Sequence, residues 1–455
     1  MSREPAAGPL GGGAPDGASH GAWHAAPHAA SEAAPGADLT APLLDPAFYA
    51  GDPHPHFARL RAEAPVARHE APGFWAVSRH EDVVTVSRDT GTFCSGQGIM
   101  VFEIGTTYDT PPTMMHTDPP EHTRYRALVQ PGFRPTFVRG LEAGIRERTR
   151  ALVARIEPGV PVDVVSELAV PLPLQVISDL LGVPEEEWPR FFRWSEAVIP
   201  GATDWPEEER AALASEMVGY LLTAAAARRS SPGDDLISEL AAAPADGGGP
   251  DDGAPAHGKG PDDGAPAGGD RLSDAELAMF LVQLLVAGNE TTRNMMSGGL
   301  VGLAETPGAW GLLRQRWESS TPRALATAVE EMLRWTTPVV SFLRTATRDT
   351  VLGGQAIAAG DPVLMLYSSA NRDEAVFGAT GDRFDVARDL NPHLAFGFGA
   401  HFCIGAVLAR LEGRILLEEL LGRFGSVEPA GPAVRTGSPV IAGVRSAPLV
   451  FGPAP

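Results

Sequence analysis

The chain has 455 residues, enough for a large buried core, and its 57 acidic against 36 basic side chains disfavour general binding to nucleic acid or anionic membranes. Its two cysteines, Cys94 and Cys403, cannot build a disulfide framework and suit a reducing compartment. No apolar run reaches the roughly 18 to 20 residues that span a bilayer, and no signal-peptide pattern opens the chain. We therefore expect a cytoplasmic protein without a membrane span.

Two segments have the composition of disordered chain. Residues 1–38 are rich in Ala, Gly, Pro and His and contain almost no large aliphatic side chains, so we expect a disordered tail. Residues 241–270 carry the octapeptide Gly-Pro-Asp-Asp-Gly-Ala-Pro-Ala twice, starting at Gly249 and at Gly260. Such a short duplication indicates a flexible insertion rather than a repeat fold.

After the tail, the pattern predicts a helix over 56–64, a strand over 74–78 and a helix over 83–88. The next segment, 96–113, mixes glycine with large apolar side chains and has no clear period. Such a loop either packs on the core or covers a substrate, and the residues alone favour neither alternative. The residues concerned are Ile99, Met100, Val101 and Phe102.

A helix is expected to open at 118–126, with proline in its first turn. It places His122 and Arg126 four residues apart on one face. Two donors on one face suit an anion, although such a pair is usually a solvated surface. Helices are then expected to continue to about residue 230, with a Pro- and Trp-containing break at 200–206.

The most unusual helix is expected over 275–303, after a capping box formed by Ser273 and Glu276. Its centre, Ala287-Gly288-Asn289-Glu290-Thr291-Thr292, puts glycine and polar groups where the helix is otherwise apolar, which is locally costly. Function is expected at such places. Thr291 can bond a preceding carbonyl or a ligand, and Glu290 can relay protons. A glycine kink with satisfied polar groups explains the same residues equally well.

Downstream, Thr321-Pro322 predicts a helix start. This helix holds Glu331 and Arg334 three residues apart, which alone is a common surface ion pair, and Arg388 is a plausible third member. Strand formers follow in Val339-Val340-Ser341-Phe342-Leu343-Arg344. A later strand-like run covers 440–444.

The run Phe396-Gly397-Phe398-Gly399-Ala400-His401-Phe402-Cys403-Ile404-Gly405 is punctuated by glycines that allow a flat ligand to approach the backbone. Cys403 precedes a helix expected over 404–421, whose N-terminus would favour the thiolate. A lone cysteine cannot make a tetrahedral zinc site or an iron–sulfur cluster. One axial thiolate on a haem iron fits better, and a buried structural cysteine is the alternative.

This loop resembles the haem-binding signature of the cytochrome P450 monooxygenases, Phe-Gly-x-Gly-x-His-x-Cys-x-Gly, at every defined position. The other motifs also occur in that family's order: His122 with Arg126, the 287–292 run, Glu331 with Arg334, and Arg344. The resemblance covers residues 39–455. It implies a single domain, mainly α with small β-sheets, forming a triangular helical prism around a buried haem.

The resemblance also implies roles for individual residues. Cys403 would be the axial ligand of a haem b iron, Thr291 would hydrogen-bond dioxygen, and Glu290 would feed protons to it. The haem propionates would be bound by His122, Arg126, Arg344 and His401. Further haem contacts would be Phe396, Gly397, Gly405, Ala287 and Gly288. Glu331, Arg334 and Arg388 would be structural. Substrate contacts would come from Ile99, Met100, Val101, Phe102, Val339, Val340, Phe342 and Val440.

Such a protein is expected to hydroxylate a hydrophobic small molecule with O2 and two electrons. The electrons would come from NAD(P)H through a ferredoxin reductase and a ferredoxin, which Arg124, Arg410 and Arg414 would help to dock. The 287–294 run is similar to that of bacterial members that oxidise sterols, branched lipids or terpenoids. A polyketide-type substrate, a peroxide-driven enzyme and a non-catalytic haem sensor are the alternatives. We expect a monomer.

Overall fold

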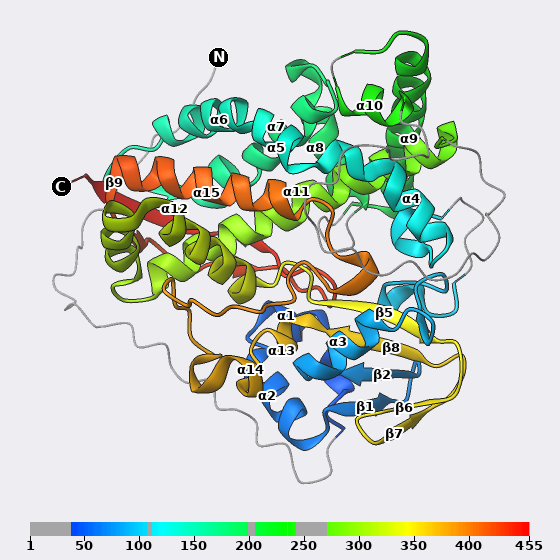
Figure 1. The fold of residues 1–455 in the computed structure, drawn as a ribbon. Helices are drawn as coiled ribbons and strands as arrows, with labels where there is room; N and C mark the ends of the chain where they lie inside the picture. Colours follow the sequence, from blue (N-terminus) through cyan, green and yellow to red (C-terminus); the bar gives the residue numbers. More distant parts are fainter. Residues whose placement is uncertain (1–37, 107–111, 199–204, 234, 243–270, 455) are drawn as a thin grey trace, which may run out of the picture. The chain divides into compact units, whose positions relative to one another are not determined.

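The computed structural model describes residues 38–106, 112–198, 205–233, 235–242 and 271–454. The expected tail and the expected insertion at 241–270 lie outside these residues, except for Asp38, Ala241 and Ala242. Helices predominate and the sheets are small (Figure 1), which confirms the predicted fold class.

The helical part is organised around α11 (Asp274–Glu305). Its predicted capping box is present, because the Glu276 amide donates to Ser273 Oγ at 3.2 Å and the Ser273 amide donates to Glu276 Oε2 at 2.7 Å. Most of its side chains are buried, and it contacts helices on several sides. These are α7 (Pro171–Leu180), α8 (Trp188–Val198), α9 (Glu207–Ser230), α12 (Ala309–Thr336) and α15 (Ala406–Arg423).

The remaining elements of this part connect those helices. They are α4 (Glu121–Val129), α5 (Pro135–Gly140), α6 (Glu142–Ala154), α10 (Leu236–Ala242) and the three-stranded sheet of β4 (Pro161–Asp163), β12 (Pro448–Pro453) and β9 (Phe424–Pro429). In Figure 1, α12 and α15 run beside α11, in agreement with the contacts between them.

The helix start predicted at Thr321-Pro322 is wrong, because α12 already begins at Ala309. Upstream of the Thr-Pro pair, Trp310 and Leu313 recur at helical spacing and are buried. Tertiary packing of this apolar face extends the helix towards the N-terminus, where a local start signal suggested a boundary.

The largest sheet has the strand order β1-β2-β8-β5-β3, with β2 and β8 parallel and the other pairs antiparallel. Its strands are β1 (Val66–His69), β2 (Phe74–Val77), β8 (Pro362–Leu366), β5 (Ser341–Ala346) and β3 (Phe93–Cys94). The extended segment predicted around residue 342 is therefore confirmed as β5. Because strand side chains alternate between faces, Phe342 and Arg344 share one face of it.

Short helices and two hairpins complete the α-helices and strands of the described residues. They are α1 (Pro46–Ala50), α2 (His54–Glu63), α3 (His80–Arg88), α13 (Tyr367–Ala370), α14 (Glu374–Phe377), β6 (Thr350–Leu352) with β7 (Gln355–Ile357), and β10 (Val434–Arg435) with β11 (Val444–Ser446).

The strand predicted over 440–444 is largely wrong, because β11 begins only at Val444 and Ile441 makes just an isolated bridge with Val339. Ser438 Oγ accepts from the amides of Val440 and Ile441, at 3.2 Å each. These two amides are therefore satisfied by a side chain. The Val440 carbonyl accepts from the Val340 amide at 2.7 Å and the Ala442 amide donates to the Pro338 carbonyl at 3.0 Å, so the run pairs at one antiparallel bridge without extending into a strand.

Candidate active site

One cavity brings together motifs that are far apart in the sequence. The cysteine loop, α4, α11, β5 and α15 all contribute to its wall. All the residues for which haem contact is expected line it: Cys403, His401, His122, Arg126, Arg344, Phe396, Gly397, Gly405, Ala287 and Gly288. Its apolar side chains include Ile99, Met114, Met115, Phe133, Ile177, Phe280, Leu284, Val339 and Phe342.

The cysteine loop owes its shape to its glycines. Gly397 and Gly399 have φ values of +70° and +73°, which side-chain-bearing residues rarely adopt. A Cβ on Gly399 would lie 2.5 Å from the carbonyl oxygen of Ser87. The Cys403 amide donates to the Phe396 carbonyl at 2.9 Å, which closes the loop and turns the sulfur to the cavity.

The electrostatics at Cys403 differ from the sequence expectation. Helix α15 starts at Ala406, not at 404, and burial raises the pKa of the Cys403 thiol despite opposition from the Gly405 amide, Arg126 and Arg410. Coordination to a cation would reverse this direction, because a metal-bound thiol is deprotonated. Among the described residues, no three His, Cys, Asp or Glu side chains gather as an alternative metal site.

A cluster of nitrogen-bearing side chains lies on the wall near this loop. The rings of His122 and His401 are 4.1 Å apart between centroids, and Arg126 donates to the carbonyl of Ala400 at 3.3 Å. Arg344 is buried, and its guanidinium donates to its neighbour's carbonyl. His122 Nε2 is buried without a hydrogen-bond partner among the described residues.

The burial of this cluster without a carboxylate partner in the described part of the chain suits an anion. Burial and the nearby arginines lower the pKa of His122 to about 4 and that of His401 to about 3. Burial also lowers the pKa of Arg126 and Arg344. Among the described residues, no carboxylate forms an ion pair with this cluster. The two carboxylates of a haem would supply the missing negative charge, so the residues fit that group.

Thr291 faces the cavity, whereas the neighbouring Glu290 does not line it. Thr291 lines the cavity and donates through Oγ1 to the Ala287 carbonyl at 2.6 Å. Gly288 also lines the cavity, and a Cβ there would lie 2.8 Å from Ile177 Cδ1 on α7. Helix α11 continues through this glycine without interruption, so close packing rather than a break explains it.

Glu290 is buried on the side of α11 away from the cavity. Its Oε2 pairs with Arg293 at 3.1 Å, and Asn294 donates to its Oε1 at 3.2 Å. Arg293 also pairs with Glu196 of α8 at 2.8 Å. Burial and the proximity of Glu290 raise the pKa of Glu196, whereas Arg293 opposes this. Sequence reasoning missed Glu196, whose only signal is an acid on the apolar face of an amphipathic helix.

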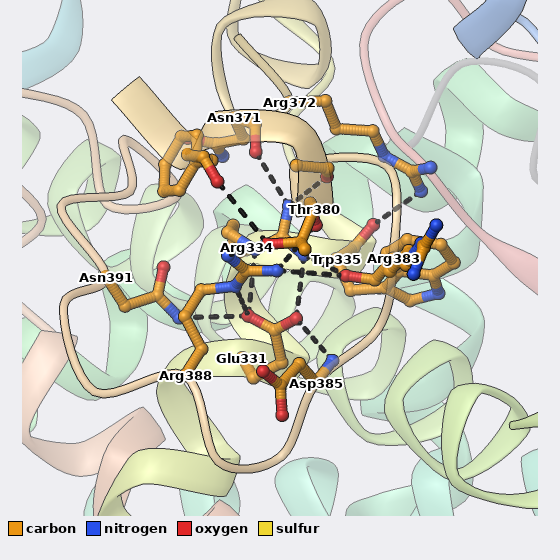
Figure 2. Close-up of polar contacts among 12 residues, drawn as sticks. Glu331, Arg334, Trp335, Asn371, Arg372, Thr380, Arg383, Asp385, Arg388 and Asn391 are labelled. Atoms are coloured by element: carbon orange, nitrogen blue, oxygen red, sulfur yellow. Dashed lines mark hydrogen bonds and ion pairs between the residues drawn. The ribbon is translucent and has the colours of Figure 1, made fainter. Parts of the chain in front are cut away.

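Glu331, Arg334 and Arg388 form one buried network (Figure 2). Glu331 accepts two bonds from Arg334, at 2.7 and 2.8 Å, and one from Arg388 at 3.1 Å. Arg334 also donates to the carbonyls of Asn371, Gly381 and Arg383. The network ties α12 to the chain leading to the cysteine loop.

Three of the eight expected substrate contacts line the cavity, and the other five do not. Ile99, Val339 and Phe342 line the cavity. Outside its wall lie Met100, Val101, Phe102, Val340 and Val440; among these, Phe102 is 49% exposed, and Val340 lines a separate, smaller cavity. Sequence reasoning missed Met114 and Met115, which have no periodic pattern around them.

The three arginines expected to dock a ferredoxin are already paired. Arg124 binds Glu276 at 2.8 Å, and Arg410 binds Glu330 at 2.7 Å. Arg414 binds both Glu142 and Glu418. Their charge is largely neutralised, so they do not form the free basic patch that the sequence suggested.

Glu412 of α15 is a further buried acid on the cavity wall. Its Oε2 has no hydrogen-bond partner among the described residues, and burial raises the pKa of the carboxyl to about 8, from 4.5. The unfolded chain therefore loses this proton at lower pH than the folded protein does. As the pH rises from the pKa of the unfolded chain to that of the folded protein, the free energy of unfolding should therefore fall, by up to about 1.4 kcal/mol per pH unit.

We predict that Glu412→Gln removes this pH dependence, because glutamine has no proton to lose. Urea unfolding should show the variant more stable than the parent at pH 8, with a smaller difference near pH 4.5. Equal pH slopes for the two proteins would contradict the prediction.

Within the described residues, the structure contains no helix with the length and apolar character needed to cross a bilayer.

A family model described as cytochrome P450 matches residues 262–435. A putative cytochrome P450 126 of Mycobacterium tuberculosis is 42% identical, over 90% of this chain and 96% of the relative. A methyl-branched lipid omega-hydroxylase of the same species is 38% identical, over 87% and 90%. A linalool 8-monooxygenase of Pseudomonas putida is 36% identical, over 88% and 96%.

Among solved structures, Mycobacterium marinum cytochrome P450 CYP268A2 in complex with pseudoionone has a TM-score of 0.75 and 34% identity, and the match covers 89% of this chain and 97% of that one.

Proposed function

This chain belongs to the cytochrome P450 family and is a monooxygenase, and from that premise we propose that it hydroxylates a branched hydrophobic molecule, a lipid or terpenoid. The proposed class includes sterols, which are hydrophobic molecules larger than linalool. The overall reaction would consume O2, two electrons and two protons and yield an alcohol and water.

The observation that carries the proposal is the apolar wall of the cavity. Ile177, Leu284 and Phe342 come from three different elements and present only hydrocarbon there. Removing apolar substrate surface from water is favourable by about 25 cal/mol per Å², and such a wall offers few hydrogen bonds. Substrate orientation would therefore be set mainly by shape. The relatives named for a methyl-branched lipid and for linalool support the same chemical class.

Haem supplies the oxygen-activating chemistry when it is bound. In our proposal, Cys403 holds its iron, and His122, Arg126, Arg344 and His401 hold its propionates. Thr291 lies on the same wall, where its hydroxyl can leave the Ala287 carbonyl and donate a proton into the cavity. Glu290 would resupply that proton after turning away from Arg293, with Glu196 as the next acid along the route.

We predict that Thr291→Ala lowers product formation by about a hundredfold, because a positioned proton donor contributes roughly 10²- to 10⁴-fold. The absorption spectrum of the carbon-monoxide-bound protein should not change. Thr327→Ala is the matched control, since Thr327 bonds the carbonyl four residues earlier in the same way but lies outside the cavity wall. A loss of product in both variants would remove the special role of Thr291.

Electron delivery is also part of the proposal. A separate ferredoxin and its reductase would carry electrons from NAD(P)H. Val407 of α15 is 40% exposed and lies outside the cavity wall, Phe402 is equally exposed but lines the cavity, and Arg134 and Arg139 of the α5 region are exposed. We place the ferredoxin contact there instead of at the paired arginines, since apolar anchors with rim charges suit a transient partner. Activity as a monomer remains a prediction.

The test is turnover by the haem-loaded protein with NADPH, a ferredoxin and its reductase. Methyl-branched fatty acids, linalool and cholesterol are offered separately, and products are identified by mass spectrometry as the gain of one oxygen atom. Oxygenation of one class supports the proposal. Turnover only with hydrogen peroxide would favour the peroxide-driven alternative, and no product with any donor would favour a haem sensor.

A further inference from the structure

The connection between β3 and α4 forms part of the cavity wall, and one carboxylate organises it. Here this wall segment means residues 95–106 and 112–118. It supplies Ile99 from its first half and Met114 and Met115 from its second half to the cavity. The carboxylate of Glu103 forms hydrogen bonds with both halves.

Glu103 is only 5% exposed although it carries a carboxylate. Its Oε2 accepts from the amides of Ile99 and Met100, at 2.7 and 2.9 Å. Burial raises the pKa of this carboxyl, but the hydrogen bonds from His116 and from these amides outweigh burial and lower it. Glu103 is therefore ionised at neutral pH, and its bonds to the first half are charge-assisted.

The same carboxylate reaches the second half of the segment. Its Oε1 lies 3.2 Å from His116 Nε2, and His116 Nδ1 lies 2.9 Å from Thr113 Oγ1. The turn held in this way, Met114–His116, carries Met114 into the cavity wall. Asp118 also joins the two halves at their outer ends, where it accepts from the amides of Ser95 and Gly96 at 2.8 and 2.9 Å. Glu103 is the link next to Ile99 and to the turn that carries Met114.

Ile99 is held at both of its backbone groups. Its amide donates to Glu103, and its carbonyl accepts from the Leu343 amide of β5 at 2.6 Å. The side chain is 1% exposed and faces the cavity from this fixed position. Loss of the Glu103 bond would leave Ile99 tied to β5 alone, beside Phe342 of the same wall.

We propose that Glu103 is a positioning residue for the substrate. By bonding Ile99, Met100 and His116 together it holds both halves of the wall segment against the cavity and sets how long a ligand stays there. This inference rests on the proposed function only in taking the cavity to be the substrate site. Glu103 itself does not touch the cavity, so its effect is transmitted through Ile99 and Met114.

The test begins with amide hydrogen exchange of the ligand-free, haem-loaded protein, read by mass spectrometry on peptides covering 95–106 and 112–118. Glu103→Ala should speed exchange in both peptides. His116→Ala should speed it only in the second, because the bonds from Glu103 to Ile99 and Met100 remain. Glu63→Ala is the matched control, as it removes an exposed glutamate that pairs with Arg59.

The second readout is the dissociation rate of 4-phenylimidazole, followed by stopped-flow absorption. Glu103→Ala should raise this rate at least about tenfold, because charge-assisted hydrogen bonds are lost. Glu103→Gln keeps an acceptor for the amides and a donor for His116, so it should restore most of the parent rate. The effect of the double variant Glu103→Ala, His116→Ala should be smaller than the two single effects combined, because each single variant already breaks the bond between Glu103 and His116.

Parent-like exchange and parent-like release in Glu103→Ala would overturn the inference, and so would faster exchange with unchanged release. Neither readout uses the natural substrate. If the substrate panel gives no product while these changes occur, the proposed substrate class fails and the role of Glu103 stands.

Discussion

Replacing Cys403 with alanine is expected to abolish the strongly red-shifted Soret band of the dithionite-reduced, carbon-monoxide-bound protein and all monooxygenase activity. Among the described residues that line the cavity, Cys403 is the one thiol, at the end of a loop shaped by Gly397 and Gly399. Without it the cavity offers no thiolate to an iron atom. The effect should be complete, because a metal–thiolate bond has no partial substitute in an alanine side chain.

Cys94→Ala is the control for this experiment. Cys94 is buried on β3 and lies outside the cavity wall, and burial raises the pKa of its thiol too. The Cys94→Ala variant should therefore keep the spectrum and the activity of the parent protein. A parent-like band in Cys403→Ala would contradict the assignment of the ligand, and a band of the histidine-ligated type in the parent protein would show that another residue binds the iron.

Local chemistry made much of this site predictable. The capping box at Ser273 and Glu276 needs only its own turn, and the cysteine loop needs only glycines at positive φ. Motifs of this kind carry their geometry within a few residues. These motifs meet at one cavity because of the fold. The fold itself was predicted from the family resemblance and not from packing.

Features that depend on distant packing could not be predicted. Glu196 and Arg293 are 97 positions apart and meet only because α8 packs on α11. The burial that raises the pKa of the metal-free Cys403 thiol comes from surrounding segments, whereas the expectation rested on the local effect of the following helix alone. The start of α12 was misplaced for the same reason, since the burial of Trp310 is a tertiary property.

Replacing Glu331 with alanine is expected to destabilise the folded protein by about 3 to 5 kcal/mol, because it leaves the guanidinium groups of Arg334 and Arg388 buried without their carboxylate. Against typical stabilities of about 5 to 15 kcal/mol this is a large fraction. The loss should appear as a lower urea midpoint and a lower haem content. It should not be a selective loss of turnover, because the network lies outside the cavity wall.

The adjacent residue provides the control. Glu330 binds Arg410 and His393 and is 27% exposed, whereas Glu331 is fully buried. Solvent can rehydrate Arg410, which is 39% exposed, but not His393, which is 3% exposed, so Glu330→Ala should cost about 1 to 2 kcal/mol, less than Glu331→Ala. Comparable losses in the two variants would mean that burial of the network is not what makes it important. A large loss of stability in Glu331→Ala alone would show that two ion pairs from adjacent residues of α12 contribute differently to the free energy of unfolding, because only one of them is removed from water.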